Sequence, residues 1–250
     1  SSVAHAFSND GLTVYGVSTK YVGGTNQGSK AFYAVAGDQM RELATPTASL
    51  SISGTPIKVL ANGKIAATST NGRLIVWAGN NSASALEQTV GTGATIVHND
   101  SDSNIFLRTG TTNSYGSWVV SNQSLTPFRI GSSASSVRIA GGGNAAGRVV
   151  GESVNTPLQT VAFRFSIING YEELGHLGAT SAGLTYSSAK LELDNGLVVG
   201  DSRYGNFGMR GFYWESGVGM QSIGTLGTDS AGNGFSTISG KLNFNQVYGQ

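Results

Sequence analysis

The 250-residue sequence has no cysteine and little charge, and both absences exclude functions. Without cysteine there are no disulfides, thiol nucleophiles or cysteine-ligated metals. Only 12% of the residues are charged and the net charge is +1, so the chain lacks the basic stripe that nucleic-acid binding requires. No apolar run reaches the roughly 18 residues of a membrane-spanning helix. The opening SSVAHAFSND has neither the basic nor the apolar region of a signal peptide.

Proline is scarce, with 4 residues, whereas glycine is abundant, with 37. Many small residues and few charges suit short strands joined by tight turns and do not suit helices, which favour Ala, Leu, Glu and Lys. Hydrophobic residues make up 39% of the chain and aromatic residues 9%, enough apolar surface to offset the entropy of folding. The composition therefore predicts an all-β protein with a buried core.

The chain contains an internal repeat. GRVVGES (147–153) matches GLVVGDS (196–202), and AFRFSIINGYEELGHLG (162–178) matches GFYWESGVGMQSIGTLG (211–227), both at an offset of 49 residues. Residues 9–43 carry a third copy, in NDGLTVYGVS and KAFYAVAGDQMREL. A repeat of this length is the first feature that a fold prediction must explain.

Each unit contains four short strand candidates. Asn-Gly and Asp-Gly pairs such as Asp10-Gly11, Asn62-Gly63 and Asn195-Gly196 predict a tight hairpin after the first strand. The first strands are expected at 3–8, 56–61, 95–99, 137–141, 189–194 and 234–239. We expect one repeat domain over 1–250, with units of about 1–48, 49–93, 94–132, 133–178, 179–227 and a partial unit at 228–250.

Four-stranded repeats of roughly 40–50 residues are typical of a β-propeller. Large rings would fill the space between successive sheets, at Phe32, Trp77, Trp118, Phe163 and Phe212. A β-sandwich is the alternative, but it would not need an aromatic residue at the same place in every unit. The first two strands occur six times and the last two five times. Three arrangements are compatible with this count: a five-blade ring with an extra hairpin, a six-blade ring with one thin blade, or a chain that lacks a downstream partner.

The segments AFYAVAGDQMREL, AFRFSIINGYEELGHLG, VVGDS and GFYWESGVGMQSIGTLGTDSAGNGFSTISG carry a family resemblance. They resemble the HAF-repeat family of extracellular proteins, although the His-Ala-Phe triplet is altered, for example to Lys30-Ala31-Phe32. The match is good over 147–240, moderate over 1–48 and weak over 49–132. The resemblance implies a secreted or surface-displayed bacterial protein, often an autotransporter passenger, and it implies no catalytic chemistry.

Two acidic residues, Glu152 and Asp201, directly follow the VVG segment in successive units. Paired carboxylates on one rim would suit glycoside hydrolysis. The alternative is that a short acidic side chain ends the second strand and accepts turn hydrogen bonds. A fixed repeat position favours this architectural role.

Oxygen-bearing side chains alternate at Asp100, Asp102 and Asn104, a pattern that can wrap Ca²⁺. The glycine that usually follows such a loop is absent, and Ile105 stands there. The incomplete pattern favours a solvated turn, so Ca²⁺ is the alternative and no other cofactor is expected.

Aromatic residues in the connections between the second and third strands suit sugar binding, because rings stack on pyranose faces. Rigid scaffolds commonly carry function on such loops. The alternative is that these tyrosines cover hydrophobic edges. The candidate ligand-binding residues are Tyr204, Arg203, Asp201, Glu152, Tyr21, Asn26 and Tyr115.

No G-x-S-x-G elbow is present and the three histidines match no catalytic motif, so an enzyme is not expected. The sequence favours a secreted or cell-surface binding and adhesion module that recognises a glycan or protein. The first alternative is a structural subunit of an extracellular matrix or fibre that associates with itself through free sheet edges. The second is a carbohydrate-active enzyme.

Overall fold

The computed structural model describes most of the chain. The described residues are 1–45, 51–52, 56–79, 85–109, 116–120, 128–131, 136–142, 147–243 and 246–250, with 116–118, 128, 142, 241 and 243 described by their backbone alone. The chain forms two compact units, residues 1–114 with 118–128 and residues 115–117 with 129–250. Each unit is considered by itself.

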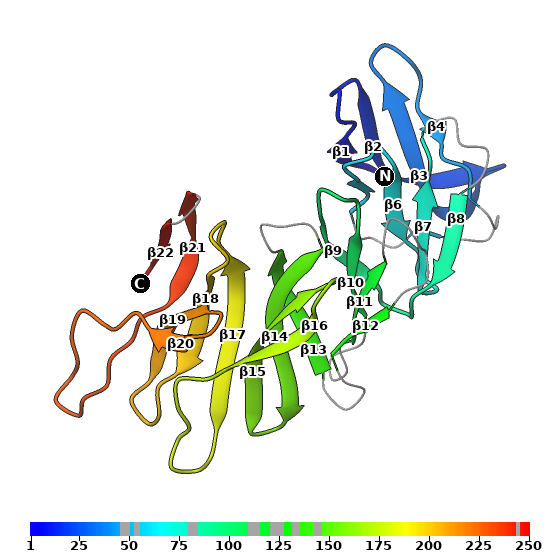
Figure 1. Ribbon diagram of the computed structural model, residues 1–250. Coiled ribbons are helices and arrows are strands. Elements are labelled where there is room, and N and C mark those ends of the chain that lie inside the picture. Colours follow the sequence, from blue (N-terminus) through cyan, green and yellow to red (C-terminus); the bar gives the residue numbers. More distant parts are fainter. Residues whose placement is uncertain are drawn as a thin grey trace. The chain divides into compact units, whose positions relative to one another are not determined.

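The first part of the chain forms successive four-stranded sheets, each with its strands in chain order (Figure 1). The first sheet contains β1 (Ser2–Phe7), β2 (Thr13–Val22), β3 (Thr25–Val35) and β4 (Arg41–Glu42). The second contains β5 (Lys58–Val59), β6 (Ile65–Thr68), β7 (Arg73–Trp77) and β8 (Ala85–Thr89). The third contains β9 (Thr95–Asn99), β10 (Ile105–Thr109), β11 (Gly116–Val120) and β12 (Phe128–Ile130).

The second unit repeats the arrangement twice. Its first sheet contains β13 (Ser136–Gly142), β14 (Arg148–Thr156), β15 (Gln159–Ser166) and β16 (Gly170–Gly175). Its second contains β17 (Thr185–Glu192), β18 (Val198–Arg203), β19 (Met209–Glu215) and β20 (Gly219–Ser222). A short parallel bridge, which pairs Gln159 with Thr185 and Thr160 with Tyr186, joins the two sheets. A hairpin of β21 (Ile238–Asn243) and β22 (Gln246–Gly249) follows.

The all-β prediction and the four-stranded repeat are confirmed: in the described residues, three separate four-stranded sheets and the joined pair of four-stranded sheets precede one hairpin. The strand expected at 234–239 was misplaced, because β21 begins at Ile238. Residues just before it bond to the preceding sheet instead. The Ser236 amide donates to the Met209 carbonyl, and its hydroxyl donates to the Gly224 carbonyl.

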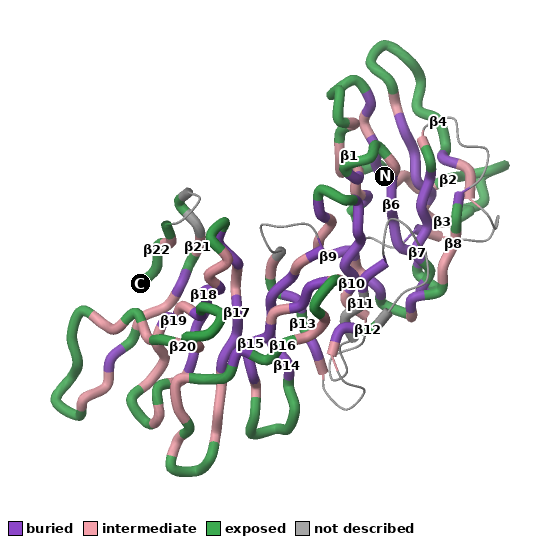
Figure 2. Tube along the Cα trace, in the orientation of Figure 1, coloured by how far each residue is buried: buried purple, intermediate pink, exposed green. Residues whose placement is uncertain are grey.

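The core lies between successive sheets, as the aromatic repeat predicted (Figure 2). Trp77, Phe163 and Phe212 are fully buried. Phe212, from the second sheet of the second unit, packs in one cluster with Ala162 and Leu174 from the sheet before it. The expected burial of Trp118 falls on a side chain outside the described residues. Within each compact unit, successive sheets thus cover one another, because a single four-stranded repeat cannot bury its own core.

One five-residue turn recurs through both units. The first residue donates its amide to the carbonyl of the fifth, and the fourth, which has a positive φ, donates its amide to the carbonyl of the first; these turns are 60–64, 69–73, 100–104, 180–184, 193–197 and 229–233. The fourth position requires a positive φ, which glycine adopts without strain, as Gly63 does at 78°. Ser103 holds this position at 63° and is the one non-glycine residue with positive φ among those described.

Candidate functional site

Glu152 lies on β14 and is buried, with 5% of its surface exposed. Its Oε1 accepts a hydrogen bond of 2.8 Å from Nε of Arg138, the residue directly opposite on β13. Its Oε2 accepts a hydrogen bond of 3.4 Å from the hydroxyl of Tyr186, which lies on β17 in the next sheet. Burial, and then the charge of Glu152, raise the pKa of Tyr186. Glu152 therefore ties two successive sheets together.

Asp201 holds the equivalent place on β18 and is 8% exposed. Its Oδ1 accepts a hydrogen bond of 2.8 Å from the amide of Ile238, and its Oδ2 pairs with the Lys190 ammonium. Lys190 also donates to the carbonyl of Ile238, so the two side chains clamp both backbone groups of one residue. The oxygens of both acids are thus engaged within the protein. This geometry favours the architectural role over contact with a ligand.

The segment at 100–104 is a hydrogen-bonded turn. Oδ1 of Asp100 accepts hydrogen bonds of 2.9 Å from the amides of Asp102 and Asn104, and Oδ2 accepts one of 2.8 Å from the Asn104 side-chain amide. Asp229 and Asn233 make the same bonds in a turn where Ala231 replaces the middle acid. The arrangement therefore does not depend on a second carboxylate.

The calcium interpretation gains no support from this geometry, because Asn104 turns its nitrogen and not its oxygen toward Asp100. Within the described ranges, no group of three or more His, Asp or Glu residues could hold a metal ion. Asp100 and Asn104 at the two ends of the turn are buried, whereas Ser101 and Asp102 at its tip are exposed to solvent.

The remaining sequence candidates fall in different places. Tyr21 and Asn26 form an exposed cross-strand pair at the tip of the β2–β3 hairpin, in the first unit. The Asn26 side chain accepts a hydrogen bond of 2.7 Å from the Gly28 amide, a turn contact. Tyr115 lies outside the described residues. Arg203 and Tyr204 belong to the second unit, where Arg203 is half-exposed on β18 opposite Met209.

Tyr204 begins the tight connection between β18 and β19. Its amide donates to the Gly208 carbonyl, and the Phe207 amide donates back to the Tyr204 carbonyl. Gly205 and Gly208 have φ values of 58° and 100°, which glycine adopts readily. The turn therefore holds Tyr204 and Phe207 three residues apart on one short loop, with 38% and 46% of their surfaces exposed.

The two rings line an open hollow of about 260 Å³. Their centroids are 6.4 Å apart and their planes are tilted by 46°. Leu177 and Gly178, from the repeated Leu-Gly-x-Leu-Gly segment, complete the hollow together with Gly205. A Cβ on Gly178 would lie 3.0 Å from the Gly205 amide nitrogen, so the absence of a side chain lets the two backbones approach closely.

Arg210 supports Tyr204. Its guanidinium carbon lies 4.2 Å from the centroid of the Tyr204 ring, a cation–π contact that restrains the ring. Its Nε is buried and has no hydrogen-bond partner among the described residues. Sequence reasoning found Tyr204 but missed Phe207 and Arg210. The Gly-x-Phe-Gly spacing after Tyr204 was a usable signal for Phe207, whereas no pattern indicated Arg210.

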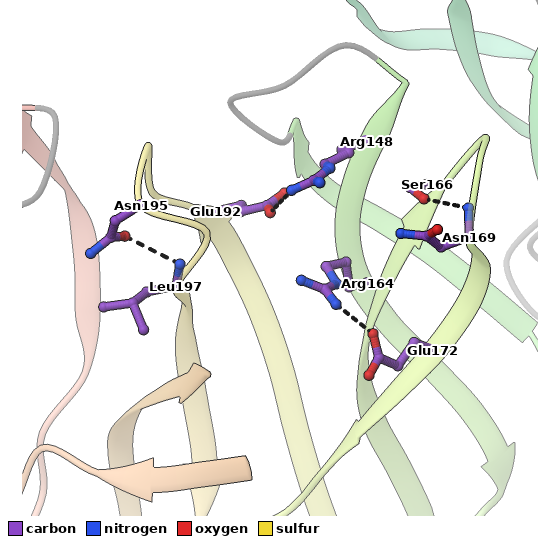
Figure 3. A network of polar contacts seen from close by, with 8 residues as sticks. All are labelled: Arg148, Arg164, Ser166, Asn169, Glu172, Glu192, Asn195 and Leu197. Carbon is purple, nitrogen blue, oxygen red and sulfur yellow. Dashed lines mark hydrogen bonds and ion pairs between the residues drawn. The ribbon is translucent and has the colours of Figure 1, made fainter. Parts of the chain in front are cut away.

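A second polar cluster lies between the two sheets of the second unit (Figure 3). Arg148 reaches Glu192 at 2.8 Å, and the Glu192 side chain is fully buried. Arg164 pairs with the exposed Glu172 at 2.7 Å and lies 4.6 Å from the ring centroid of Trp214. These contacts join β14 to β17 and β15 to both β16 and β19, so they hold the two sheets together.

Comparison with known proteins identifies no relative by sequence. No protein family matches the chain, and no curated protein does. In the part of the chain that the structure describes, no helix is long and apolar enough to cross a membrane.

Solved structures do share the fold. The chain is similar to dipeptidyl peptidase 4 of Porphyromonas gingivalis, with a TM-score of 0.56, 11% identity, and coverage of 93% of this chain and 39% of the peptidase. It is also similar to the β-propeller domain of the Trilobed protease from Pyrococcus furiosus (TM-score 0.48, 8% identity, 90% and 71% coverage) and to TolB from Acinetobacter baumannii (0.46, 12%, 89% and 52%). At such low identity the likeness concerns the fold alone, and of these three structures the peptidase has a TM-score above 0.5. The chain is an all-β protein of four-stranded sheets that match β-propeller domains.

Proposed function

We propose that this protein is a binding module that recognises a carbohydrate through the hollow beside Tyr204. The observation that carries the proposal is the pair of exposed rings, Tyr204 and Phe207, held on one short turn beside Leu177. Small-molecule sites are commonly lined by aromatic and apolar groups with a few polar groups nearby. Arg210 supplies a charge at this place and restrains the ring on which a sugar would stack.

The size of the hollow suits one sugar ring of a larger glycan. Its volume of about 260 Å³ lies just below the ~300 Å³ at which small-molecule pockets begin. The rest of the glycan would then lie over the surface, as adhesion to a polymer requires. We propose no catalytic step at this place, since Asp201, the acid of the neighbouring strand β18, is hydrogen-bonded to the Ile238 amide and paired with Lys190.

The cellular setting is part of the same proposal. The repeat resembles that of HAF-repeat proteins, so we place the module outside a bacterial cell, secreted or displayed on the surface. A fold of five four-stranded sheets supports this idea only as a rigid scaffold that can present loops.

A glycan array with the intact 250-residue protein tests the proposal. We expect binding to a defined set of glycans, and Tyr204→Ala should weaken it by a factor of about 2 to 12, because an aromatic contact contributes about 0.5–1.5 kcal/mol. Tyr21→Ala is the matched control, since Tyr21 is also an exposed tyrosine near the end of a second strand but has no part in the hollow. The proposal fails if no glycan binds, or if both variants bind as the parent protein does.

A further inference from the structure

Arg210, beside the hollow, has no acidic partner in the described part of the chain. Three other arginines of the same unit each pair with a glutamate, namely Arg138, Arg148 and Arg164. Arg210 contacts the Tyr204 ring instead, with its guanidinium carbon 4.2 Å from the ring centroid. Its Nε is buried and bonds to no acceptor among the described residues. The positive charge next to the hollow is therefore not neutralised by a described carboxylate.

The register of the sheet places Arg210 on the side of the hollow. Arg210 lies directly opposite Ser202, and residues opposite one another in an antiparallel pair share a face. The Ser202 hydroxyl accepts a hydrogen bond of 3.0 Å from the amide of Leu177, which lines the hollow. Arg203, opposite Met209, is one position further along and lies on the other face. The sheet thus directs one arginine toward the hollow and the other away from it.

The rings and the arginine are not a feature of every unit. The counterparts of Tyr204, Phe207 and Arg210, 49 positions earlier, are Asn155, Leu158 and Val161. These residues include no aromatic ring and no charge, although the preceding sheet has the same four strands. The architecture of the repeat therefore does not explain this set of side chains, whereas a ligand site on one loop does.

Two acids of the same region leave the charge of Arg210 in place. Asp201, on β18, is paired with Lys190. Asp229, in the connection that follows β20, accepts hydrogen bonds at both of its oxygens from Asn233. Neither acid bonds to Arg210. An anion that enters the hollow would therefore meet a guanidinium that no neighbouring acid occupies.

A sugar in the hollow would lie within range of this charge. Atoms in contact are about 3.5–4.0 Å apart, so a sugar ring packed on Tyr204 lies within roughly 8 Å of the guanidinium. This distance is about one Debye length at physiological ionic strength, so salt does not abolish the attraction. The N–H groups of a guanidinium form charge-assisted hydrogen bonds with oxyanions, which would hold an acidic substituent of that sugar.

We propose that the hollow selects an acidic glycan, one whose sugar carries a carboxylate or sulfate group. Tyr204 and Phe207 contact the sugar ring, and the Arg210 guanidinium attracts the acidic group. This inference rests on the proposed function and adds the charge of the ligand to it. Complementary charge supplies the selection against neutral sugars, which the apolar contacts alone would not provide.

A glycan array that carries each acidic glycan beside a neutral counterpart tests the inference with the intact protein. One arm pairs uronate oligosaccharides with their methyl esters, and the other pairs sulfated oligosaccharides with their desulfated forms. The arms therefore separate carboxylate from sulfate. We expect the acidic member of at least one pair to bind at least tenfold more tightly than its neutral counterpart. This preference should fall as NaCl is raised from about 0.05 M to about 0.5 M, because salt screens the attraction.

The ratio of acidic to neutral affinity separates recognition of charge from a structural role of Arg210. Arg210→Met removes the charge and should bring the ratio close to one, whereas a purely structural role would weaken both members alike. Arg210→Lys keeps the charge and should retain part of the preference. Arg203→Met is the matched control: it removes a positive charge from the other face and should change the ratio by less than about twofold.

The outcomes distinguish this inference from the proposed function. Equal binding of the acidic and neutral members would overturn the inference and leave glycan binding in place. Binding of neither member would overturn both. Preference for acidic glycans that Arg210→Met and Tyr204→Ala leave unchanged would show that the charge is recognised elsewhere on the surface, and would also overturn the inference.

Discussion

Phe212 lies directly opposite Gly200 and covers it so closely that a Cβ on the glycine would meet the ring at 2.9 Å. On the other side of Gly200, the carbonyl oxygen of Ser188 would lie only 2.0 Å from that Cβ. The glycine is therefore enclosed by its first-strand and third-strand neighbours at once. Since only glycine fits, the pair sets the register of the central strands in the sheet.

Gly200→Ala should destabilise the protein by about 1–3 kcal/mol or more, because the added methyl group overpacks the sheet. Gly227→Ala is the matched control: it has open space around it and no positive φ, and should change stability by less than about 0.5 kcal/mol. Urea unfolding measures both. Similar stability of the two variants would contradict the close approach of Phe212.

The ion pair of Arg148 and Glu192 should be strongly coupled, because the Glu192 side chain is fully buried. Arg148→Met leaves a buried carboxylate without its cation and should cost about 3–5 kcal/mol. The double variant Arg148→Met with Glu192→Leu should recover much of this loss, since no buried charge then remains. A double variant less stable than Arg148→Met alone, by chemical denaturation, would contradict this account.

Two histidines should make stability depend on pH. Nδ1 of His5 accepts a hydrogen bond of 3.1 Å from the Ile57 amide, and burial lowers the pKa of His5. Burial also lowers the pKa of His98, with a further decrease from Lys58 that Asp100 opposes. The folded pKa values thus lie below the unfolded value of about 6.5. The two histidines therefore contribute fully to the free energy of unfolding above about pH 6.5, and this contribution is lost as the pH falls toward their pKa values in the folded protein.

The pH effect can be separated from that of carboxylates. Hydrogen bonds from Ser8 and Asn233 lower the pKa values of Asp10 and Asp229, respectively. The contribution of these two carboxylates to the free energy of unfolding is present above about pH 3.8 and is lost only below it. Thermal unfolding between pH 7.5 and 5 should therefore show a slope that the double variant His5→Asn with His98→Phe reduces. An unchanged slope in the double variant would refute the assignment.

Ser103 combines a strained backbone with a useful side chain. Its φ of 63° costs about 1–3 kcal/mol for a non-glycine residue, and its hydroxyl accepts a hydrogen bond of 2.9 Å from the Asn62 amide. Ser103→Gly removes both features, so its effect on the free energy of unfolding should be small. Ser103→Ala keeps the strain and loses the bond, and should be less stable than Ser103→Gly by about 1–3 kcal/mol. The reverse order in urea unfolding would contradict the geometry.

Turn chemistry and periodicity were enough to predict the fold from the sequence. Asn62-Gly63 and Asn195-Gly196 indicated hairpins because glycine at the fourth turn position adopts positive φ, a local requirement. The repeated aromatic positions indicated sheets that cover one another, which Phe163 and Phe212 confirm by full burial. The start of β21 at Ile238 was not predictable, because the residues before it are hydrogen-bonded to the preceding repeat and a local sequence pattern does not indicate such bonds.

The candidate site was predictable only in part. Tyr204 was identifiable because a ring in the connection between the second and third strands stands out from the repeat. The cation under that ring, Arg210, meets it only because β18 and β19 pair in one register. Asp201 looked like a rim acid in the sequence, yet it bonds to Ile238, 37 residues away.

The sequence by itself determined the strands, the tight turns and the repeat of about 49 residues, because hydrophobic alternation and glycine conformations act over a few neighbouring residues. Tertiary structure alone decided which polar groups are hydrogen-bonded between sheets, such as Glu152 and Asp201, and which side chains line an open hollow, such as Tyr204. The physical reason is that burial and long-range hydrogen bonding depend on how sheets pack, and residues far apart in the chain meet only after they have packed.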